Sequence, residues 1–483
     1  MDFPAQSHRS DPPSGMILPK MQLSRRDLFL TSPLLLTRAQ AEVTPDIVQF
    51  PAELEPLVGL VERTARDRCA EMAVEQLRRG VSYRQFMAAL FLAGIRNVNP
   101  RPPGFALHCV FVIHAAHLLG LEAPADLRLL PLFYALDDFK AAQERDAKAV
   151  GGDYTMRAFR GPVPDANRAA AELSAAMEAW DTERGERAIV SLARNRTATE
   201  VFALLWQYGA RDYRNIGHKA IFVANACRTL QTIGWQHAEP VLRSVTLALL
   251  DFGREQKMNG YAYEDQCYAG NLKRMEAFTR LDANWTSDHA DAAATRKVLA
   301  AIRESSPDEA CTGTVNRILK DKVSAATVWD AVHLAAAELR MRAAGGAALA
   351  SVHAVTSANA LHYAYSTASD QRTRFLLTLQ GVGWMTQFRV AAGARPENLR
   401  AFAITDLDTG PKPPSLTDAI RYTVSKVNEV HYYKYLGALI EDIPLMSAEW
   451  QPHLLAAVPY YTKTAADSEP PAMKRAREAL RSL

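Results

Sequence analysis

Apolar residues recur at steps of three and four through most of the chain, which is the period of an amphipathic α-helix. Clear examples are the alanine-rich segments 166–180 (ANRAAAELSAAMEAW) and 328–344 (VWDAVHLAAAELRMRAA). The alternation of apolar and polar residues that is typical of strands is missing, apart from a short candidate at 402–407 (FAITDL). The pattern therefore predicts an all-α protein.

Four predicted helix starts resemble one another and indicate an internal repeat. Each begins with a hydroxyl residue, and the first two carry Gln or Glu at the third position after it, which completes a capping box. The four starts are Ser82–Gln85, Thr197–Glu200, Ser324–Thr327 and Ser415–Asp418. An apolar segment with a leading histidine follows each start, at His108, His218, His353 and His431. We expect four helical hairpins in a toroid-like or solenoid-like bundle, each placing a histidine near the start of its second helix, although alanine-rich helices also resemble one another by chance.

The four leading histidines predict a metal site. One buried histidine on an apolar helix is most often a core residue with a hydrogen-bond partner, but equivalent positions of a repeat converge around a common axis. Neutral imidazole is a ligand for iron, copper, zinc and nickel, and the positive end of a helix dipole disfavours its protonated form. Four nitrogens with an open position favour redox iron or copper over structural zinc. The expected ligands, around a central cavity, are His108, His218, His353 and His431.

Polar residues further along the same segments predict the surroundings of this metal. Asn225 shares a helix face with His218, and amide groups of this kind support metal-bound imidazoles. The predicted supporting or substrate-binding residues are His114, His117, Asn225, Arg228, Asn359 and Tyr263, the last from the aromatic-rich segment 261–271. His362 is expected to line the cavity and to take part in catalysis. The alternatives are hydrogen bonds between helices of a large core and, for Tyr263, an ordinary packed loop.

A lysine shares a helical stripe with the fourth leading histidine. In HYYKYLGALIED, residues 431–442, His431, Lys434 and Glu441 lie on one stripe. Burial among aromatic residues would lower the pKa of Lys434 and make its amine reactive, so that uptake of CO2 would turn it into a carboxylate ligand. The alternative is a lysine whose amine reaches solvent. Lys434 is therefore a candidate catalytic residue.

Composition excludes several classes of protein. The 483 residues are 48% hydrophobic and 23% charged with a net charge of +3, which indicates a soluble protein without a nucleic-acid or membrane-surface footprint. No apolar run is long enough for a stable membrane span. The five cysteines form no CxxC or haem-attachment motif and make a poor disulfide framework, so we interpret them as small buried hydrophobes.

The N-terminus is typical of an export signal. Paired arginines in SRRDLFL, residues 24–30, precede a short apolar segment and a small-residue cleavage site at 39–41. This order indicates a twin-arginine signal peptide over residues 1–41, with a general secretory signal as the alternative. We expect residues 42–483 to form one large helical domain, with a weaker boundary near 290–310, in the periplasm or outside the cell.

Three segments together resemble the questin oxidase-like proteins: FALHCVFVIHAAHLLGL, HAVTSANALHYAY and VHYYKYLGALIED. Matching positions are His108, His353 and the pair His431 and Lys434, whereas His218 depends on the internal repeat. The resemblance implies a helical enzyme with non-haem iron held by several histidines, a carboxylated lysine, and O2 as co-substrate. The export signal departs from the family and leaves the natural substrate open.

These observations favour an exported metal-dependent oxidoreductase, a non-haem iron oxygenase that acts with O2 on an organic, aromatic or quinone-like molecule. It would depend on the twin-arginine export machinery and bind no nucleic acid. Two alternatives remain open, a helical-repeat scaffold without catalysis and a haem protein with two axial histidines.

Overall fold

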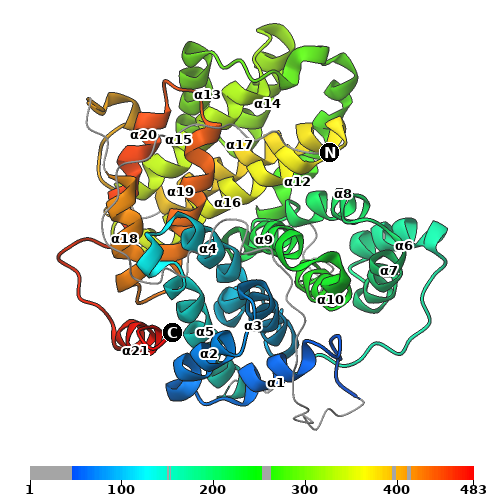
Figure 1. Ribbon diagram of the computed structural model, residues 1–483. Helices are drawn as coiled ribbons and strands as arrows, with labels where there is room; N and C mark the ends of the chain where they lie inside the picture. The colour runs from blue at the N-terminus through cyan, green and yellow to red at the C-terminus, as the bar shows by residue number, and fades with distance from the viewer. Residues whose placement is uncertain are drawn as a thin grey trace.

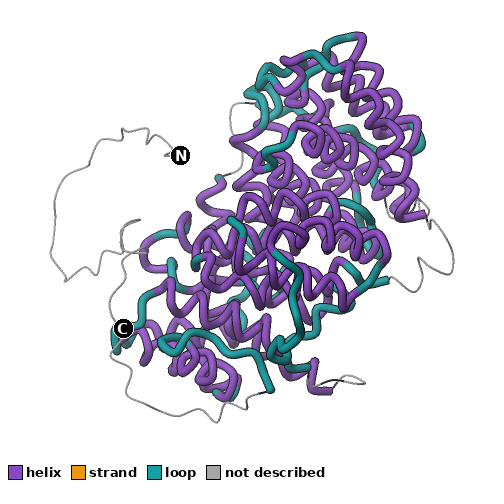
Figure 2. The backbone as a smooth tube through the Cα atoms, turned by 90° about the vertical axis from the view of Figure 1, so that its right-hand side faces the viewer, coloured by secondary structure: helices purple, strands orange, loops and turns teal. Residues whose placement is uncertain are grey.

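The computed structural model describes residues 46–483 except 149–151, 153, 253–262, 394–396, 398 and 411–414. The predicted signal peptide, residues 1–41, lies outside this part. Helices make up most of the described chain (Figure 1, Figure 2). The described residues form two isolated β-bridges and no strand. The prediction of an all-α fold is therefore confirmed.

The first half of the described chain contains the helices α1 (Glu55–Arg63), α2 (Cys69–Arg78), α3 (Tyr83–Asn97), α4 (His108–Glu122), α5 (Leu130–Lys148), α6 (Ala166–Ala179), α7 (Thr182–Asn195), α8 (Ala198–Gly209), α9 (His218–Ile233) and α10 (Ala238–Leu249). The second half contains α12 (Tyr263–Arg274), α13 (Ala292–Glu304), α14 (Pro307–Lys320), α15 (Ala325–Arg342), α16 (Ala347–Thr367), α17 (Gln371–Gly393), α18 (Leu416–Lys426), α19 (His431–Asp442), α20 (Gln451–Ala457) and α21 (Pro471–Leu480).

One element predicted from the sequence is wrong. The strand candidate at 402–407 contains a short 3₁₀ helix, Ile404–Asp406, instead of a strand. The backbone N–H of Ile404 donates to a carboxylate oxygen of Glu338 at 2.8 Å. A side chain therefore satisfies the backbone donor that a neighbouring strand would otherwise accept from.

All four predicted helix starts form as the sequence indicates. Ser82 and Thr197 make complete capping boxes at the N-termini of α3 and α8. Ser324 and Ser415 cap α15 and α18 through the hydroxyl alone. Each of these helices pairs with the helix that follows it and carries a leading histidine, which gives the hairpins α3–α4, α8–α9, α15–α16 and α18–α19.

The second helices of the four hairpins pack in a closed ring. Helix α4 contacts α9, α9 contacts α16, α16 contacts α19, and α19 contacts α4 (Figure 1). These helices are far apart in the sequence, so the ring is built from long-range packing. It explains how the histidines that lead these segments come together, whereas a regular toroid or solenoid remains a prediction.

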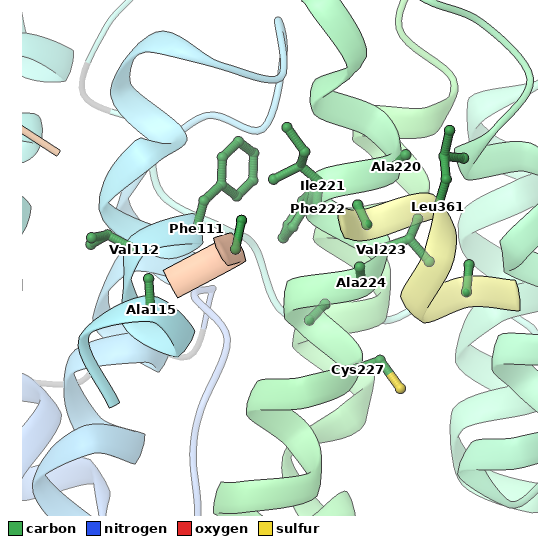
Figure 3. Close-up of a cluster of buried hydrophobic side chains, with 14 of the residues drawn as sticks. Phe111, Val112, Ala115, Ala220, Ile221, Phe222, Val223, Ala224, Cys227 and Leu361 are labelled. Carbon is green, nitrogen blue, oxygen red and sulfur yellow. The ribbon is translucent and has the colours of Figure 1, made fainter. Parts of the chain in front are cut away.

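Apolar and small side chains fill the ring. Figure 3 shows Phe111 of α4 beside Ile221 and Phe222 of α9, and the rings of Phe111 and Phe222 lie 5.1 Å apart. Gly437 of α19 lies so close to α4 that a Cβ atom there would meet the Ala115 Cβ at 3.3 Å. Small residues at such contacts let the helices approach closely around the histidines.

The proposed weaker boundary near 290–310 falls on α13 and the start of α14. Both helices pack against α17, and α13 also packs against α15. Within the described residues, none of the helices combines the length and apolar character needed to cross a bilayer.

A buried arginine joins the first helix to the body of the fold. Arg96 of α3 is 2% exposed and pairs with Glu55 at 2.6 Å and with Glu62 at 2.7 Å, both on α1. We expect Arg96→Met to lower the free energy of unfolding by about 3–5 kcal/mol, because removal of one partner leaves buried carboxylates unpaired. Urea unfolding followed by circular dichroism measures this change.

The matched control is Arg79→Met, which removes an exposed arginine paired with Glu75 at 2.8 Å. Exposed pairs of this kind contribute about 1 kcal/mol or less. Equal losses in the two variants would contradict a structural role for the buried pair.

Candidate metal centre

Three of the four predicted ligands are the first residues of their helices. His108 begins α4, His218 begins α9 and His431 begins α19. His353 is the exception, because α16 already begins at Ala347, so the prediction of a helix-start position is wrong for this residue. The preceding alanines are strong helix formers and extend α16 by nearly two turns ahead of the histidine.

The four imidazole rings meet at the ring of helices. We call His108, His218, His353 and His431 the four-histidine centre. Neighbouring ring centroids lie 4.9 Å (His108–His218), 4.6 Å (His218–His353), 4.8 Å (His353–His431) and 4.6 Å (His431–His108) apart. The Nε2 atom of His218 is 2.7 Å from that of His108 and 3.1 Å from that of His353. The structure therefore brings together side chains that are more than 300 residues apart.

Hydrogen bonds to carbonyl groups fix the tautomers of two of these rings. The Nδ1 atom of His218 lies against the carbonyl oxygen of Asn215, and that of His353 lies 2.8 Å from the carbonyl oxygen of Leu349. Only an Nδ1–H can donate to a carbonyl, so in both neutral rings Nε2 carries a lone pair. Two lone pairs thus face each other at 3.1 Å without a proton to share. A cation between the rings would remove this repulsion.

The fourth histidine has the same arrangement with an acidic partner. The Nδ1 atom of His431 lies 2.7 Å from the carboxylate of Glu429, while its buried Nε2 has no hydrogen-bond partner among the described residues. A carboxylate behind the ring is a common support for metal-bound histidine. Glu429 was not among the residues found from the sequence, although its position two residues before a leading histidine was a visible signal.

Burial keeps the four rings neutral. Desolvation is the largest cause of the lowered pKa of each histidine, and the charge of Lys434 lowers the four values further. The pKa of His218 falls to about 3. Neutral rings offer lone pairs to a metal at physiological pH.

The spacing of the nitrogens fits a transition metal. Metal–imidazole bonds of about 2.0–2.1 Å place neighbouring ligand nitrogens in an octahedral or square arrangement about 2.9 Å apart. The two measured Nε2 separations lie on either side of this value. For His108, His218 and His353, whose ligand nitrogens lie within 4.8 Å of one another, donor set and spacing fit a metal ion held by imidazole.

A strained turn holds His218 in place. Asn215, Ile216 and Gly217 precede it with φ values of 50°, 51° and 84°, a run of left-handed residues that includes a β-branched side chain. Such a conformation is unfavourable and persists only where the surroundings enforce it. A Cβ atom at Gly217 would lie 2.2 Å from the Ser357 hydroxyl of α16, so glycine is required there.

Buried ion pairs anchor both ends of this turn. Arg214 pairs with Asp265 of α12, with one nitrogen–oxygen distance of 2.7 Å. Lys219, which is fully buried, pairs with Asp212 at 2.7 Å. These pairs fix the backbone on each side of His218.

Lys434 lies beside the four-histidine centre. Its Nζ atom is buried, has no hydrogen-bond partner among the described residues, and sits 5.7 Å from the centroid of the Phe111 ring. Desolvation lowers the pKa of Lys434 to about 7. The lysine faces a cavity of about 20 Å³, room for roughly one water molecule.

Glu441 organises the other side of this cavity. Its carboxylate accepts hydrogen bonds from His114 at 2.8 Å and from Asn359 at 3.0 Å, and pairs with Arg228 at 2.7 Å. The charge of Arg228 is the main favourable influence that holds the pKa of Glu441 at about 2 against desolvation. Three residues predicted to surround the metal therefore meet at one carboxylate instead of supporting the imidazoles.

Asn225 also serves a different partner from the expected one. Its amide donates to the carbonyl oxygen of Phe111 at 3.1 Å and accepts from Arg228 at 3.2 Å. The supporting role expected for it at His218 belongs to the backbone carbonyl of Asn215.

Two other predicted residues lie outside the four-histidine centre. His117 lies 3.4 Å from the hydroxyl of Tyr83. His362 pairs with His333 at 2.8 Å and stacks on Trp329, with centroids 4.4 Å apart. The side chain of Tyr263, the first residue of α12, lies outside the described residues.

Comparison with protein-family models, curated proteins and solved structures finds no match to this chain. The resemblance to questin oxidase-like proteins therefore stays a prediction from short motifs.

We expect Gly217→Ala to destabilise the protein more than Gly80→Ala. Both glycines have positive φ, but a Cβ at Gly80 meets nothing within 4 Å, whereas one at Gly217 meets Ser357 and Trp384. Gly80→Ala should therefore lower the free energy of unfolding by about 1 kcal/mol, the cost of the left-handed conformation alone. Gly217→Ala should lower it by about 1–3 kcal/mol more, because the added Cβ also collides with its neighbours. Urea unfolding of the two variants measures the difference, and equal losses would show that the turn is not tightly packed.

Proposed function

We propose that this protein is an exported non-haem iron enzyme that uses O2 to oxidise an organic, aromatic or quinone-like substrate. The four-histidine centre holds the iron, and the metal supplies the redox chemistry when it is bound. Under this proposal the chain belongs with the questin oxidase-like proteins that its motifs resemble.

One observation carries the metal proposal, namely the pair of Nε2 lone pairs that face each other 3.1 Å apart between His218 and His353. Neither ring has a proton to place between them, and the buried Nε2 of His431 has no hydrogen-bond partner among the described residues. Buried polar atoms without partners are costly, and one cation satisfies all of them. The close approach of His108 and His218, 2.7 Å between nitrogens, favours a bare ion over a porphyrin between two axial histidines.

Lys434 completes the proposed site as a carboxylated ligand. Its neutral amine attacks the carbon of CO2, a nitrogen–carbon bond forms, and one proton leaves the nitrogen to give a carbamate. The product replaces an unpaired buried amine with an anion beside a cation. The Arg228–Glu441 pair at the other side of the adjoining cavity keeps the local charge balanced.

The proposed location is the periplasm or the exterior of the cell. Arg25 and Arg26 in the N-terminal segment support export by the twin-arginine machinery. That route carries folded proteins, which suits a metal buried at the meeting point of four hairpins.

We expect purified protein to bind about one iron ion per chain without a Soret absorption band. Replacement of the four histidines of the centre by alanine should abolish this iron, because it removes every proposed imidazole ligand. Elemental analysis after anaerobic loading with ferrous iron measures the content.

The matched control is His333→Ala with His362→Ala, which removes two buried imidazoles that lie outside the centre. This variant should keep its iron. Full iron content in the quadruple variant would refute the site, absence of metal from the wild-type protein would favour a scaffold, and a Soret band would favour haem.

We expect ¹³C-bicarbonate to produce a carbamate carbon signal in the NMR spectrum of the metal-free protein at pH 8. The pKa of Lys434, about 7, leaves most of its amine neutral at this pH, and the signal should disappear as the pH falls below 7 and the amine is protonated. Lys434→Arg should abolish the signal. Lys140→Arg, which alters a buried lysine held by backbone carbonyls, should retain it; persistence in Lys434→Arg would contradict the proposal.

A further inference from the structure

Two cysteines from separate helices, α12 and α14, meet in the core of the protein. Cys267 of α12 and Cys311 of α14 are 6% and 0% exposed, and both sulfur atoms lie against the same glycine of α17. They are 44 positions apart in the sequence and match no spacing motif. The sequence therefore gave no signal for this pair.

A glycine of α17 makes room for both sulfur atoms. A Cβ atom at Gly383 would lie 2.0 Å from the Sγ of Cys267 and 3.3 Å from the Sγ of Cys311. Any side chain at this position would collide with the first thiol. Because Gly383 has no side chain, α12 and α14 can both place a sulfur atom against α17 at this position.

The other cysteines do not share this arrangement. Cys69, Cys109 and Cys227 lie on α2, α4 and α9, and the hydrogen bond recorded for the Cys227 thiol comes from the hydroxyl of Tyr363. Among the described residues, Cys267 and Cys311 are therefore the pair placed for covalent bonding.

We propose that Cys267 and Cys311 form a disulfide when the protein meets an oxidising compartment. The oxidant is a low-molecular-weight disulfide such as oxidised glutathione. Because both thiols are buried, the exchange takes place when the helices open locally. The Cys311 thiolate then attacks one sulfur of the oxidant and releases one glutathione thiolate, and the Cys267 thiolate attacks the mixed disulfide and releases the second. Two protein thiols are oxidised, one disulfide is reduced to two thiols, and no other reactant is required. The neighbouring Cys267 thiol lowers the pKa of Cys311, which suits Cys311 as the attacking group.

The bond would brace the strained turn before His218. Cys267 is two residues from Asp265, whose carboxylate binds Arg214 at the start of that turn. Its thiol also contacts the side-chain oxygen of Gln380 at 3.6 Å, and the amide of Gln380 donates to the carbonyl of Ala210 just ahead of the turn. A covalent link from α12 to α14 therefore fixes two groups that hold the backbone leading into the four-histidine centre.

Formation of the bond does not depend on metal, while its occurrence in the cell rests on the proposed export. The test is a count of free thiols in guanidinium after incubation of the full chain with reduced or oxidised glutathione. We expect five thiols after reduction and three after oxidation, and a peptide that joins Cys267 to Cys311 in the non-reduced digest. Oxidation should also raise Tm by roughly 3–6 °C, because the cross-link restricts the unfolded chain.

Cys311→Ser and Cys267→Ser are the test variants, and Cys69→Ser is the matched control. In oxidising buffer Cys311→Ser should keep its four thiols, whereas Cys267→Ser should show three, with one glutathione bound to Cys311. Neither variant should show the rise of Tm with oxidation. Cys69→Ser should lose two thiols on oxidation, as the wild type does. Five thiols in the oxidised wild-type protein, or loss of two thiols from Cys311→Ser, would overturn the proposal. The count is independent of iron, so failure of the metal centre and failure of the disulfide give different results.

Discussion

The close packing of neutral imidazole rings in a buried core is the constraint on which the turn, the ion pairs and the helix packing around them depend. Carbonyl oxygens hold the Nδ1–H groups of His218 and His353, so their Nε2 lone pairs face each other at 3.1 Å. Protonation would relieve the repulsion, but burial lowers the pKa of both rings. The fold thus holds electron pairs together in a place where a proton is disfavoured, and a metal cation is the group that such a place accepts.

The packing around the centre shows how the chain enforces this arrangement. Three of the histidines are the first residues of their helices, so the direction of the helix orients the imidazole ring. A left-handed turn precedes His218, and packing against α16 together with two buried ion pairs fixes its conformation. The contacting faces carry alanine and glycine, which allows four helices to close a ring around the imidazoles. Local strain at one ligand is therefore supported by long-range packing and charge.

The sequence predicted the hairpins because they depend on local signals, and the repetition of those signals indicated that the hairpins would meet. Hydroxyl caps, helical periodicity and repeated histidines are short-range patterns, and Ser82 and Thr197 behave as their capping boxes indicate. The partners of polar side chains could not be predicted in the same way. Asn225 and Asn359 lie on the expected faces, yet their partners come from α4 and α19, more than 80 residues away. Helix register between distant segments decides such contacts, and a single sequence does not record it. The same holds for the meeting of Cys267 with Cys311, whereas Glu429 stands two residues before His431, where the sequence did offer a local signal.

Under the proposed function, three of the buried polar atoms that lack a hydrogen-bond partner among the described residues lie where the metal and its ligands would bind. A helical scaffold presents its polar residues to a partner at the surface, whereas the Nε2 atom of His431, the Nζ atom of Lys434 and the Nδ1 atom of His114 are all buried and unpartnered. Each such group costs about 1–3 kcal/mol, and Lys434 adds the cost of a desolvated amine. These atoms lie at the four-histidine centre and the cavity beside it, where a metal ion and a few small ligands would bind them together. Binding of the cation then contributes to the stability of the folded state. Under the proposed function, a core that the metal stabilises would favour metal loading before export, which is the order that a route for folded proteins allows.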